Sequence, residues 1–260
     1  MKQSDNKPLR PYRNLGLTFL MKQGSLDRQL AGTFGKTGTN VQETFELFFG
    51  NDPAVLEDVA AASSTMKFSP GTAILSEEDE SKSVYYILQG KAKTVRYSSD
   101  GAEVWLDEIG PGALCGEMTA LGASARTATI VAASDVTVAV FQPQTFRDLM
   151  QRHGSIGLQV AKLLVARVEK TTQRMFELAA FSSKGRVYAE LLRQARPIED
   201  SPHSKIEKMP SMSTMARQLN NTRETVSRTV NELEKEGFIK REGTELTILM
   251  PDALRDLTFS

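Results

Sequence analysis

Two segments near the middle of the chain carry residues that together can bind a phosphate. The first runs from Gly112 to Met118 and includes Gly116 and Glu117, and the second contains Arg126 and Thr127. A turn from a strand into a helix presents backbone N–H groups to an anion. A carboxylate accepts a hydrogen bond from a sugar hydroxyl, and an arginine neutralises a phosphate with two parallel hydrogen bonds. The spacing therefore indicates a site for an anionic ligand; the alternative is a structural ion pair between Glu117 and Arg126.

The segment 212–230 has the residue spacing of a helix-turn-helix. Ala216 is small enough for two helices to cross, and Asn220 tolerates the left-handed backbone of the turn between them. Thr222 can cap the second helix. Apolar residues at helical spacing predict the buried side of the motif, at Met215, Leu219, Val226, Val230 and Leu233.

The second helix of this motif opens with charged residues, at the end where a recognition helix meets the base edges of the major groove. Arg223 and Arg228 can each donate two hydrogen bonds to guanine, and Glu224 can accept one from the amino group of cytosine. The segments 237–239 and 245–249 suit a two-stranded wing. The motif predicts DNA binding; an ordinary charged surface helix is the alternative.

The residues before this motif predict a long helix that can pair with a second copy of itself. Residues 144–181 contain no proline, and small or apolar residues recur at alternating spacings of four and three. This pattern is the a/d seam of a coiled coil, formed by Gly157, Ala161, Leu164, Val168, Thr171, Met175 and Leu178. A threonine in such a seam weakens the pairing unless its hydroxyl finds a partner. We predict a dimerisation helix; the alternative is an amphipathic helix that lies on its own domain.

Brief apolar runs separated by turn signals predict a small β-barrel or β-sandwich between residues 66 and 141. The turn signals are Pro70-Gly71, Gly90, Asp100-Gly101 and Pro111-Gly112, and their spacing is typical of short strands. Residues 98–101 predict a hairpin turn between strands at 91–97 and 103–109. Residues 128–141 predict two more strands, residues 46–63 short helical pieces, and residues 198–208 a polar loop. The chain as a whole is predicted to be α+β.

The composition excludes several classes of protein. The chain has 260 residues, and its 32 Lys+Arg balance its 32 Asp+Glu, whereas a protein that binds DNA over its whole surface would be basic. The single cysteine, Cys115, excludes a disulfide framework and any four-thiolate cluster. His153 and His203 lack zinc-ligand spacing, so we expect no metal site. No apolar run approaches the roughly 20 residues of a membrane span or forms a signal-peptide core, and we expect a cytoplasmic protein.

These motifs, in this order, resemble the cyclic-AMP receptor protein (CRP/FNR) family of bacterial transcription regulators. The resemblance covers roughly residues 46–250: the Pro-Gly turns, the segment from Gly116 to Thr127, the long helix and the winged helix-turn-helix. It implies a jelly-roll-like cyclic-nucleotide-binding barrel before the helix. The iron–sulfur branch of the family needs N-terminal cysteines and the haem branch a barrel histidine, and the sequence has neither, which favours the nucleotide-binding branch.

The resemblance also implies roles for individual residues. Glu117 would bond the ribose 2′-hydroxyl, and Arg126 and Thr127 would hold the cyclic phosphate beside the Gly116 backbone. Thr171 would contact the base bound in its own subunit and Thr172 the base bound in the partner. The full implied ligand set is Gly116, Glu117, Met118, Arg126, Thr127, Arg167, Thr171 and Thr172. The implied DNA-binding set, typical of readers of TGTGA-like half-sites, is Thr222, Arg223, Glu224, Thr225, Ser227 and Arg228.

The sequence therefore predicts a homodimeric, allosteric transcription regulator that is switched by a cyclic nucleotide. Cyclic AMP is the favoured ligand, and cyclic GMP is the alternative, because Thr127 resembles a residue that favours guanine in some relatives. Double-stranded DNA and RNA polymerase are the expected partners. A regulator that binds DNA without a nucleotide switch is the second hypothesis. An enzyme such as a phosphodiesterase is not expected, because the sequence shows neither a metal cluster nor a paired acid and base.

The predicted domain boundaries follow the changes of pattern along the chain. An N-terminal extension, predicted to be mobile, occupies residues 1–45, and the nucleotide-binding barrel occupies 46–143. The dimerisation helix occupies 144–181, and the winged helix-turn-helix domain occupies 182–260. Residues 182–185 read as a hinge between the last two parts.

Overall fold

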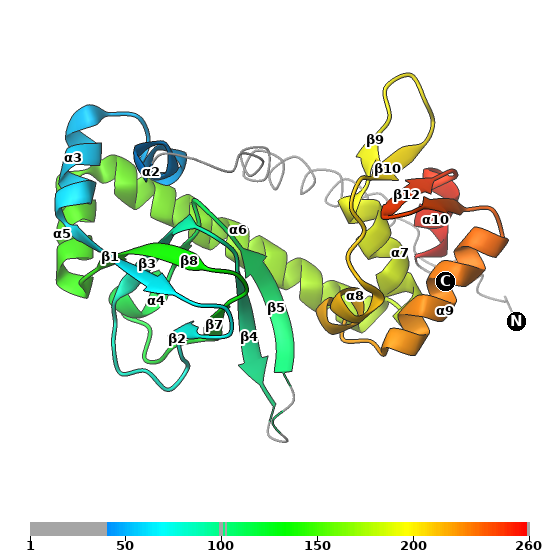
Figure 1. Cartoon of the computed structure of the whole chain (residues 1–260), viewed down its shortest axis with the longest axis horizontal. Helices are drawn as coiled ribbons and strands as arrows, with labels where there is room; N and C mark the ends of the chain where they lie inside the picture. Colours follow the sequence, from blue (N-terminus) through cyan, green and yellow to red (C-terminus); the bar gives the residue numbers. More distant parts are fainter. Residues whose placement is uncertain (1–40, 99–100, 102, 259–260) are drawn as a thin grey trace, which may run out of the picture. The chain divides into compact units, whose positions relative to one another are not determined.

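The structure, a computed structural model, describes residues 41–98, 101 and 103–258. Most of the predicted N-terminal extension, residues 1–40, lies outside the described residues. The first described helix, α2 (Val41–Phe49), begins within the last five residues of that extension. The chain is α+β: a β-rich part, then a long helix, then a helical part with a small sheet (Figure 1).

Two four-stranded sheets face each other in the β-rich part. One has the strand order β1-β8-β3-β6 and the other β2-β7-β4-β5. The first consists of β1 (Ser63–Phe68), β8 (Val136–Phe141), β3 (Val84–Gln89) and β6 (Leu114–Cys115); the second consists of β2 (Ala73–Leu75), β7 (Thr129–Ala132), β4 (Ala92–Tyr97) and β5 (Glu103–Ile109). Every strand pair in them is antiparallel. The predicted strands at 91–97, 103–109 and 128–141 are confirmed.

Strand β3 is buried on both faces of its sheet. Five of its six residues are buried, because alternate side chains enter different cores. Tyr85 and Ile87 join the core between the two sheets. Val84, Tyr86 and Leu88 join the core on the other side, where helices cover the sheet. A strand buried on both faces reads as a continuous apolar run rather than an alternating one.

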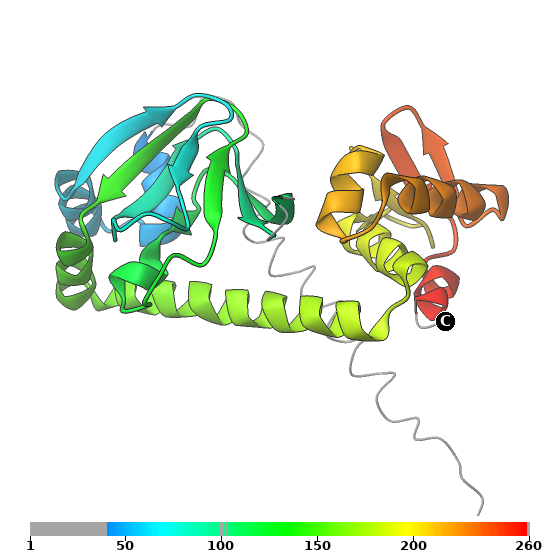
Figure 2. The ribbon, with the colours of Figure 1, turned by 90° about the horizontal axis from the view of Figure 1, so that it is seen from below.

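The covering helices are α2, α3 (Pro53–Ala61), α5 (Pro143–Arg152) and the first part of α6 (Gly154–Ala180). Asp52 caps α3 by accepting a hydrogen bond from the Ala54 N–H, and Pro53 opens the helix. The stretch predicted as one helix, 144–181, is two helices separated at His153, which has extended backbone dihedrals. Helix α6 runs along the β-rich part in Figure 2.

The C-terminal part has its own apolar core. It contains α7 (Ser183–Gln194), α8 (Met212–Gln218), α9 (Arg223–Lys235) and α10 (Pro251–Leu257). Its sheet has the order β11-β12-β10-β9, formed by β11 (Ile239–Glu242), β12 (Glu245–Ile248), β10 (Ser204–Ile206) and β9 (Arg196–Pro197). The predicted wing is the β11–β12 hairpin. The prediction of a polar loop over 198–208 is wrong at residues 204–206, which form β10.

The predicted helix-turn-helix is confirmed in its local details. Asn220 has a φ of +49°, and the Thr222 side chain accepts a hydrogen bond from the Thr225 N–H at the start of α9. Ala216 is 4 % exposed. The five predicted apolar positions are all buried in one core: Met215, Leu219, Val226, Val230 and Leu233.

Candidate functional site: an anion-binding turn, a long helix and a recognition helix

Gly116 makes the turn between β6 and the short helix α4 (Glu117–Ala120). Its φ is +81°, in the region that glycine adopts without strain. A Cβ atom there would lie 2.6 Å from Arg126 Nη1 and 2.7 Å from the Ser83 carbonyl oxygen. Glycine is therefore required twice, once for the backbone angle and once for the space that Arg126 occupies.

Arg126 is held against this turn by protein acceptors. Its Nη1 donates to the Gly116 carbonyl at 2.9 Å and to Thr119 Oγ1 at 2.9 Å, and its Nη2 donates to the Ser83 carbonyl at 2.9 Å. The residue is 7 % exposed. Its Nε–H is buried and has no acceptor among the described residues. A guanidinium fixed in this way keeps one buried donor for a ligand.

Glu117 is fully buried, with 0 % of the residue exposed. Its Oε1 accepts a hydrogen bond from Arg167 Nη1 at 2.5 Å, while its Oε2 has no partner among the described residues. Burial raises the pKa of the Glu117 carboxyl, and the charges of Arg167 and Arg126 oppose that effect. An unpaired buried carboxylate oxygen is costly, so Oε2 is placed to accept from a ligand.

Arg167 connects this turn to the long helix α6. Besides its bond to Glu117, its Nη2 donates to the Leu114 carbonyl oxygen at 2.7 Å. One turn further along the helix, Lys170 pairs with Asp107 of β5 at 2.8 Å. The turn at Gly116 is thus connected to α6 by one side chain, and the neighbouring strand β5 is connected to α6 by another.

The structure brings together four of the predicted ligand residues: Gly116, Glu117, Arg126 and Arg167. Met118 and Thr127 are exposed beside them. Thr171 and Thr172 are exposed on α6, and neither hydroxyl has a hydrogen-bond partner among the described residues. Glu117 pairs with Arg167 and not with Arg126, so the alternative of a structural Glu117–Arg126 ion pair is wrong.

Two of the groups that accept hydrogen bonds from Arg126 were not predicted from the sequence. Thr119 lies three residues after Gly116, on the first turn of α4, and its hydroxyl could have been suspected from that spacing. Ser83 contributes only its carbonyl oxygen. A backbone acceptor leaves no signature in the residue type, so only the three-dimensional arrangement reveals it.

Cys115, next to Gly116, serves as a packing residue. It is 2 % exposed and lies in the core between the two sheets. Burial raises the pKa of its thiol to about 12, so at neutral pH the reactive thiolate is scarce.

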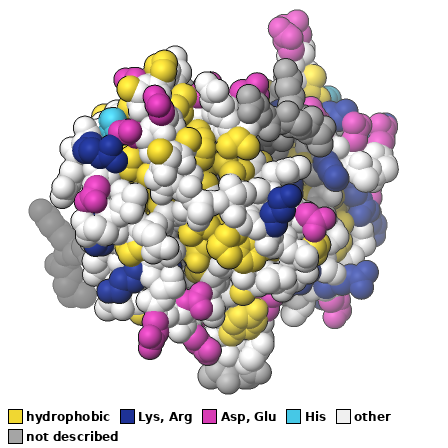
Figure 3. Space-filling model, turned by 60° about the vertical axis from the view of Figure 1, so that its left-hand side comes forward, with side chains coloured by type: hydrophobic (Ala, Val, Ile, Leu, Met, Phe, Trp, Pro, Cys, Tyr) yellow, Lys and Arg dark blue, Asp and Glu magenta, His cyan; other side chains and the backbone are white. Residues whose placement is uncertain are grey.

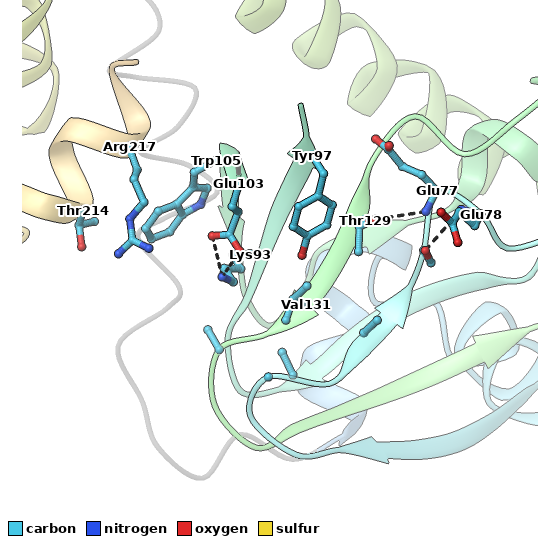
Figure 4. Close-up of a pocket in the computed structure, with 15 residues that line it drawn as sticks. Glu77, Glu78, Lys93, Tyr97, Glu103, Trp105, Thr129, Val131, Thr214 and Arg217 are labelled. Atoms are coloured by element: carbon cyan, nitrogen blue, oxygen red, sulfur yellow. Dashed lines mark hydrogen bonds and ion pairs between the residues drawn. The ribbon is translucent and has the colours of Figure 1, made fainter. Parts of the chain in front are cut away.

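A separate hollow of about 940 Å³ lies on the outer face of the β2-β7-β4-β5 sheet, and none of the four assembled ligand residues lines it. Figure 4 shows its aromatic side chains, Tyr97 and Trp105, on either side of an ion pair between Lys93 and Glu103, 2.7 Å apart. Arg217 of α8 lies over the Trp105 ring, 5.6 Å from its centroid. No motif or spacing in the sequence singles out these residues.

Helix α9 presents its N-terminal residues to solvent. A hollow of about 580 Å³ is lined by Arg223, Glu224, Ser227, Arg228 and Asn231. Arg228 pairs with Glu224 at 2.5 Å, and their side chains are 64 % and 79 % exposed. An exposed pair of this kind contributes little to stability, so it costs little to separate the two groups.

Helix α6 buries only part of its apolar surface. Ile156 and Val160 are buried in the core of the β-rich part, which is the placement expected of a helix lying on its own domain. Another face of the helix is exposed: Val168 is 66 % exposed, Met175 is 67 % exposed and Leu178 is 52 % exposed. These three belong to the predicted seam. Val104 and Leu106 of β5 are also exposed apolar residues.

The structure provides no metal site or membrane span among the residues it describes. Those residues contain no group of three or more His, Cys, Asp or Glu side chains that could hold a metal ion. None of the described helices combines the length and apolar character needed to cross a bilayer. On the face drawn in Figure 3, acidic and basic side chains are interspersed.

The chain matches two family models. Residues 65–153 match the cyclic nucleotide-binding domain, and residues 185–257 match the Crp-like helix-turn-helix domain. Together with the site geometry, these matches define a nucleotide-binding, DNA-binding regulatory protein.

Relatives and solved structures agree with this class. A CRP-like cAMP-activated global transcriptional regulator from Mycobacterium tuberculosis is 22% identical over 204 residues, which are 78% of this chain and 91% of that protein. A CooA mutant from Carboxydothermus hydrogenoformans has a TM-score of 0.69 at 17% identity, covering 85% of this chain and 97% of that one. The c-di-GMP responsive global regulator CLP of Xanthomonas campestris has a TM-score of 0.58 at 20% identity, covering 76% and 99%.

The chain belongs to the CRP/FNR family of transcription regulators. It is a cyclic-nucleotide-binding, DNA-binding protein. The family resemblance inferred from the motifs is confirmed.

Proposed function

We propose that this chain is a homodimeric regulator that binds cyclic AMP in the β-rich part and then binds a near-palindromic, TGTGA-like DNA site. The observation that carries the proposal is a pair of buried polar atoms without partners. Glu117 Oε2 and Arg126 Nε are both orphaned among the described residues, and they flank the turn at Gly116. One is an acceptor and the other a cationic donor, which are the two groups that a ribose hydroxyl and a phosphate require.

The residues present suit a cyclic nucleotide. Glu117 would accept from the ribose 2′-hydroxyl, and Arg126 and Thr127 would hold the cyclic phosphate beside the Gly116 backbone and Met118. Arg167 would neutralise the Glu117 carboxylate while the ligand is bound. Thr171 in one subunit and Thr172 in the other would donate to or accept from the base, which gives the two exposed hydroxyls the partners that they lack.

A second copy of this chain is the proposed occupant of the exposed face of α6. The support is the heptad spacing of Val168, Thr171, Met175 and Leu178, together with the exposed fractions of the three apolar members. A face of this kind on a helix that already packs on its own β-rich part is typical of an interface. The ligand would join the two helices through Thr171 and Thr172.

The ligand would act by favouring one arrangement of the paired helices. It can shift that equilibrium only as far as it binds the two arrangements with different affinity. The region around residues 182–185 would pass the change to the recognition helices. In the active arrangement the two α9 helices would lie about 34 Å apart, one turn of DNA.

Direct reading of the DNA would come from the start of α9. Arg223, Glu224 and Arg228 would contact base edges, and Thr222, Thr225 and Ser227 would lie beside them at the groove. RNA polymerase would be a further partner of the bound dimer, and the cytoplasm its location.

Cyclic AMP is proposed over cyclic GMP because the Mycobacterium tuberculosis relative is named as cAMP-activated. The structurally similar regulator CLP is c-di-GMP responsive, so the same experiment should include a cyclic dinucleotide. Thr127 is exposed beside Arg126, where it can meet a guanine base; that keeps cyclic GMP as the alternative.

Calorimetry tests the ligand assignment. The purified protein would be titrated with cyclic AMP, cyclic GMP, cyclic di-GMP and linear AMP, and so would the variants Arg126→Leu and Arg96→Leu. Arg96 is an exposed arginine on β4 that pairs with Glu77, so it is a matched control. We expect cyclic AMP to bind the wild-type protein most tightly. Arg126→Leu should bind cyclic AMP at least tenfold more weakly, because one charge-assisted hydrogen bond contributes about 1.5–3 kcal/mol to the free energy of binding. A regulator without a nucleotide switch would bind none of these ligands.

A further inference from the structure

Trp105 is the single tryptophan of the chain, and it lies on β5 at the edge of its sheet. Its ring is half-buried. The indole Nε1 donates a hydrogen bond to the Asp107 carbonyl oxygen at 2.7 Å, which restrains the ring. Because an edge strand has a neighbour on one side only, the ring is placed where another part of the chain can reach it.

Arg217, near the end of α8, places its guanidinium over this ring (Figure 4). Its Cζ atom is 5.6 Å from the ring centroid, within the roughly 6 Å of a cation–π contact. Arg217 is exposed and forms no ion pair with any described residue. Loss of an exposed contact of this kind changes an equilibrium roughly two- to fivefold, so the contact can bias the position of α8 without locking it.

The end of α8 is also attached to the long helix. Arg174 of α6 donates from Nη1 to the Gln218 carbonyl oxygen at 3.0 Å. Gln218 is the last residue of α8, where unpaired carbonyl groups attract a cation. Two adjacent residues of α8 are therefore held, one by β5 and one by α6, just before the turn that leads into α9.

Strand β5 is in turn connected to α6 beside the proposed ligand site. Lys170 donates to both carboxylate oxygens of Asp107 at 2.8 Å, and the carbonyl of Asp107 is the group that restrains Trp105. Lys170 directly precedes Thr171 and follows Arg167, which bonds Glu117, by three residues. Contacts thus continue from Glu117 through α6 and β5 to α8, and a network of this kind can carry coupling between two sites.

We propose that the contact between Trp105 and Arg217 positions the recognition helix and is favoured when a nucleotide is bound. The inference rests on the proposed function, in which Arg167 stays on Glu117 while the ligand is bound. That is the arrangement in which Trp105 and Arg217 are in contact. A ligand that favours this arrangement therefore also favours the contact, which acts on α8 in addition to the segment 182–185.

A DNA phosphate is the alternative partner of Arg217, because the first helix of a helix-turn-helix crosses the DNA backbone. The two interpretations differ at Trp105, since a phosphate contact does not need the ring. They also differ in their dependence on nucleotide. Loss of a phosphate contact weakens DNA binding equally with and without cyclic AMP and lowers its salt dependence.

The first test measures the nucleotide response, defined as the ratio of the DNA affinity with cyclic AMP to the DNA affinity without it. The proteins would be wild type, Trp105→Leu, Arg217→Gln, the double variant and the control Lys208→Gln. Lys208 is an exposed cation of the C-terminal part, so Lys208→Gln removes one positive charge outside the contact. Calorimetry with cyclic AMP would show that each variant retains its nucleotide site.

We expect each single variant to lower the nucleotide response roughly two- to fivefold. The double variant should lose no more than either single variant, because both changes remove the same contact. Lys208→Gln should respond as wild type does.

Fluorescence provides a second readout that does not involve DNA, because all tryptophan emission of the chain comes from Trp105. Saturating cyclic AMP should change the emission of the wild-type protein, since the contact with Arg217 becomes more populated. In Arg217→Gln the emission should not respond to cyclic AMP.

Three results would overturn the inference. The emission of a wild-type protein that binds cyclic AMP could stay unchanged, or Arg217→Gln could keep the wild-type nucleotide response. Arg217→Gln could also lose DNA affinity equally with and without cyclic AMP while Trp105→Leu loses none, which would assign Arg217 to phosphate. A wild-type protein that binds no nucleotide in calorimetry would instead contradict the proposed function, and the inference with it.

Discussion

The absence of a side chain at Gly116 leaves the space that the Arg126 guanidinium occupies. The φ of +81° at Gly116 is matched elsewhere, for instance by Gly71 at +83°. The two differ in their surroundings, because a Cβ on Gly71 would meet nothing within 4 Å, whereas one on Gly116 would meet Arg126 at 2.6 Å. Comparing alanine substitutions at Gly71 and Gly116 therefore separates the effect of backbone strain from the effect of a clash with Arg126.

Gly116→Ala should lose nucleotide affinity, because Arg126 must leave its position. The control Gly71→Ala should lower the free energy of unfolding by about 1–2 kcal/mol, the cost of a left-handed alanine, and Gly116→Ala should lower it further, because its Cβ would also lie 2.7 Å from the Ser83 carbonyl oxygen. Only Gly116→Ala should reduce cyclic AMP binding, by tenfold or more, in calorimetry. Equal nucleotide affinity in the two variants would show that Arg126 does not depend on this space.

Residue types and spacing grouped Gly116, Glu117 and Arg126, and the structure brings these three together. Arg167 was added by the family resemblance, not by its spacing. The pairing of Glu117 with Arg167 instead of Arg126 could not be read from the sequence. It depends on where α6 passes the turn, and 50 residues separate the two partners.

At the scale of elements, the junction between α6 and α7 contains a buried charged network. Arg193 of α7 pairs with Glu177 of α6 at 2.6 Å and with Glu190 of its own helix. Gln194 donates to Glu190 at 2.7 Å. Glu177 is 3 % exposed and Glu190 is 6 % exposed. Because buried charges are stable only when they are paired, this network fixes how α7 follows α6.

The stability of this junction should depend on pH. Burial alone would raise the pKa of Glu190, but the charge of Arg193 and the bond from Gln194 outweigh it and hold the pKa below its usual value. A lowered carboxyl pKa stabilises the folded state above the ordinary glutamate value, and that contribution is lost as the pH falls through the folded pKa.

Glu190→Gln should therefore unfold at lower denaturant concentration than wild type at about pH 7.5, and the difference should shrink by about pH 4. Chemical denaturation followed by circular dichroism measures both. Glu199→Gln is a suitable control, since it makes the same chemical change at an exposed position. A difference between Glu190→Gln and wild type that is the same at both pH values would contradict the account of this network.

Periodicity predicted most of the elements, and its failures have physical causes. The strands at 91–97 and 103–109 follow from alternating residues on either side of a Gly turn. The 144–181 stretch was predicted as one helix because it has no proline, but His153 adopts extended backbone and separates α5 from α6. Strand β10 was missed because only three residues of a polar segment pair with β12, and tertiary pairing outweighs so short a local pattern.

At the scale of the whole molecule, the proposed dimer would cover the exposed face of α6. Val168→Glu should weaken dimerisation by at least tenfold, because it places a charge in the middle of an apolar seam. Met66→Glu, at a 47 % exposed methionine on β1, makes the same kind of change outside the seam and should not alter the dimer. Sedimentation equilibrium distinguishes the two. A wild-type monomer, or a Val168→Glu protein as dimeric as wild type, would contradict the assigned interface.

We propose that a cyclic nucleotide bound at Glu117 and Arg126 controls how the two recognition helices contact DNA. The most direct test measures affinity for a TGTGA-like palindrome, at fixed salt because phosphate contacts are salt-dependent, while cyclic AMP is titrated. We predict that cyclic AMP raises the affinity of wild type at least tenfold and leaves that of Arg126→Leu unchanged. Equal affinity with and without cyclic AMP, cyclic GMP and cyclic di-GMP in the wild-type protein would contradict the account.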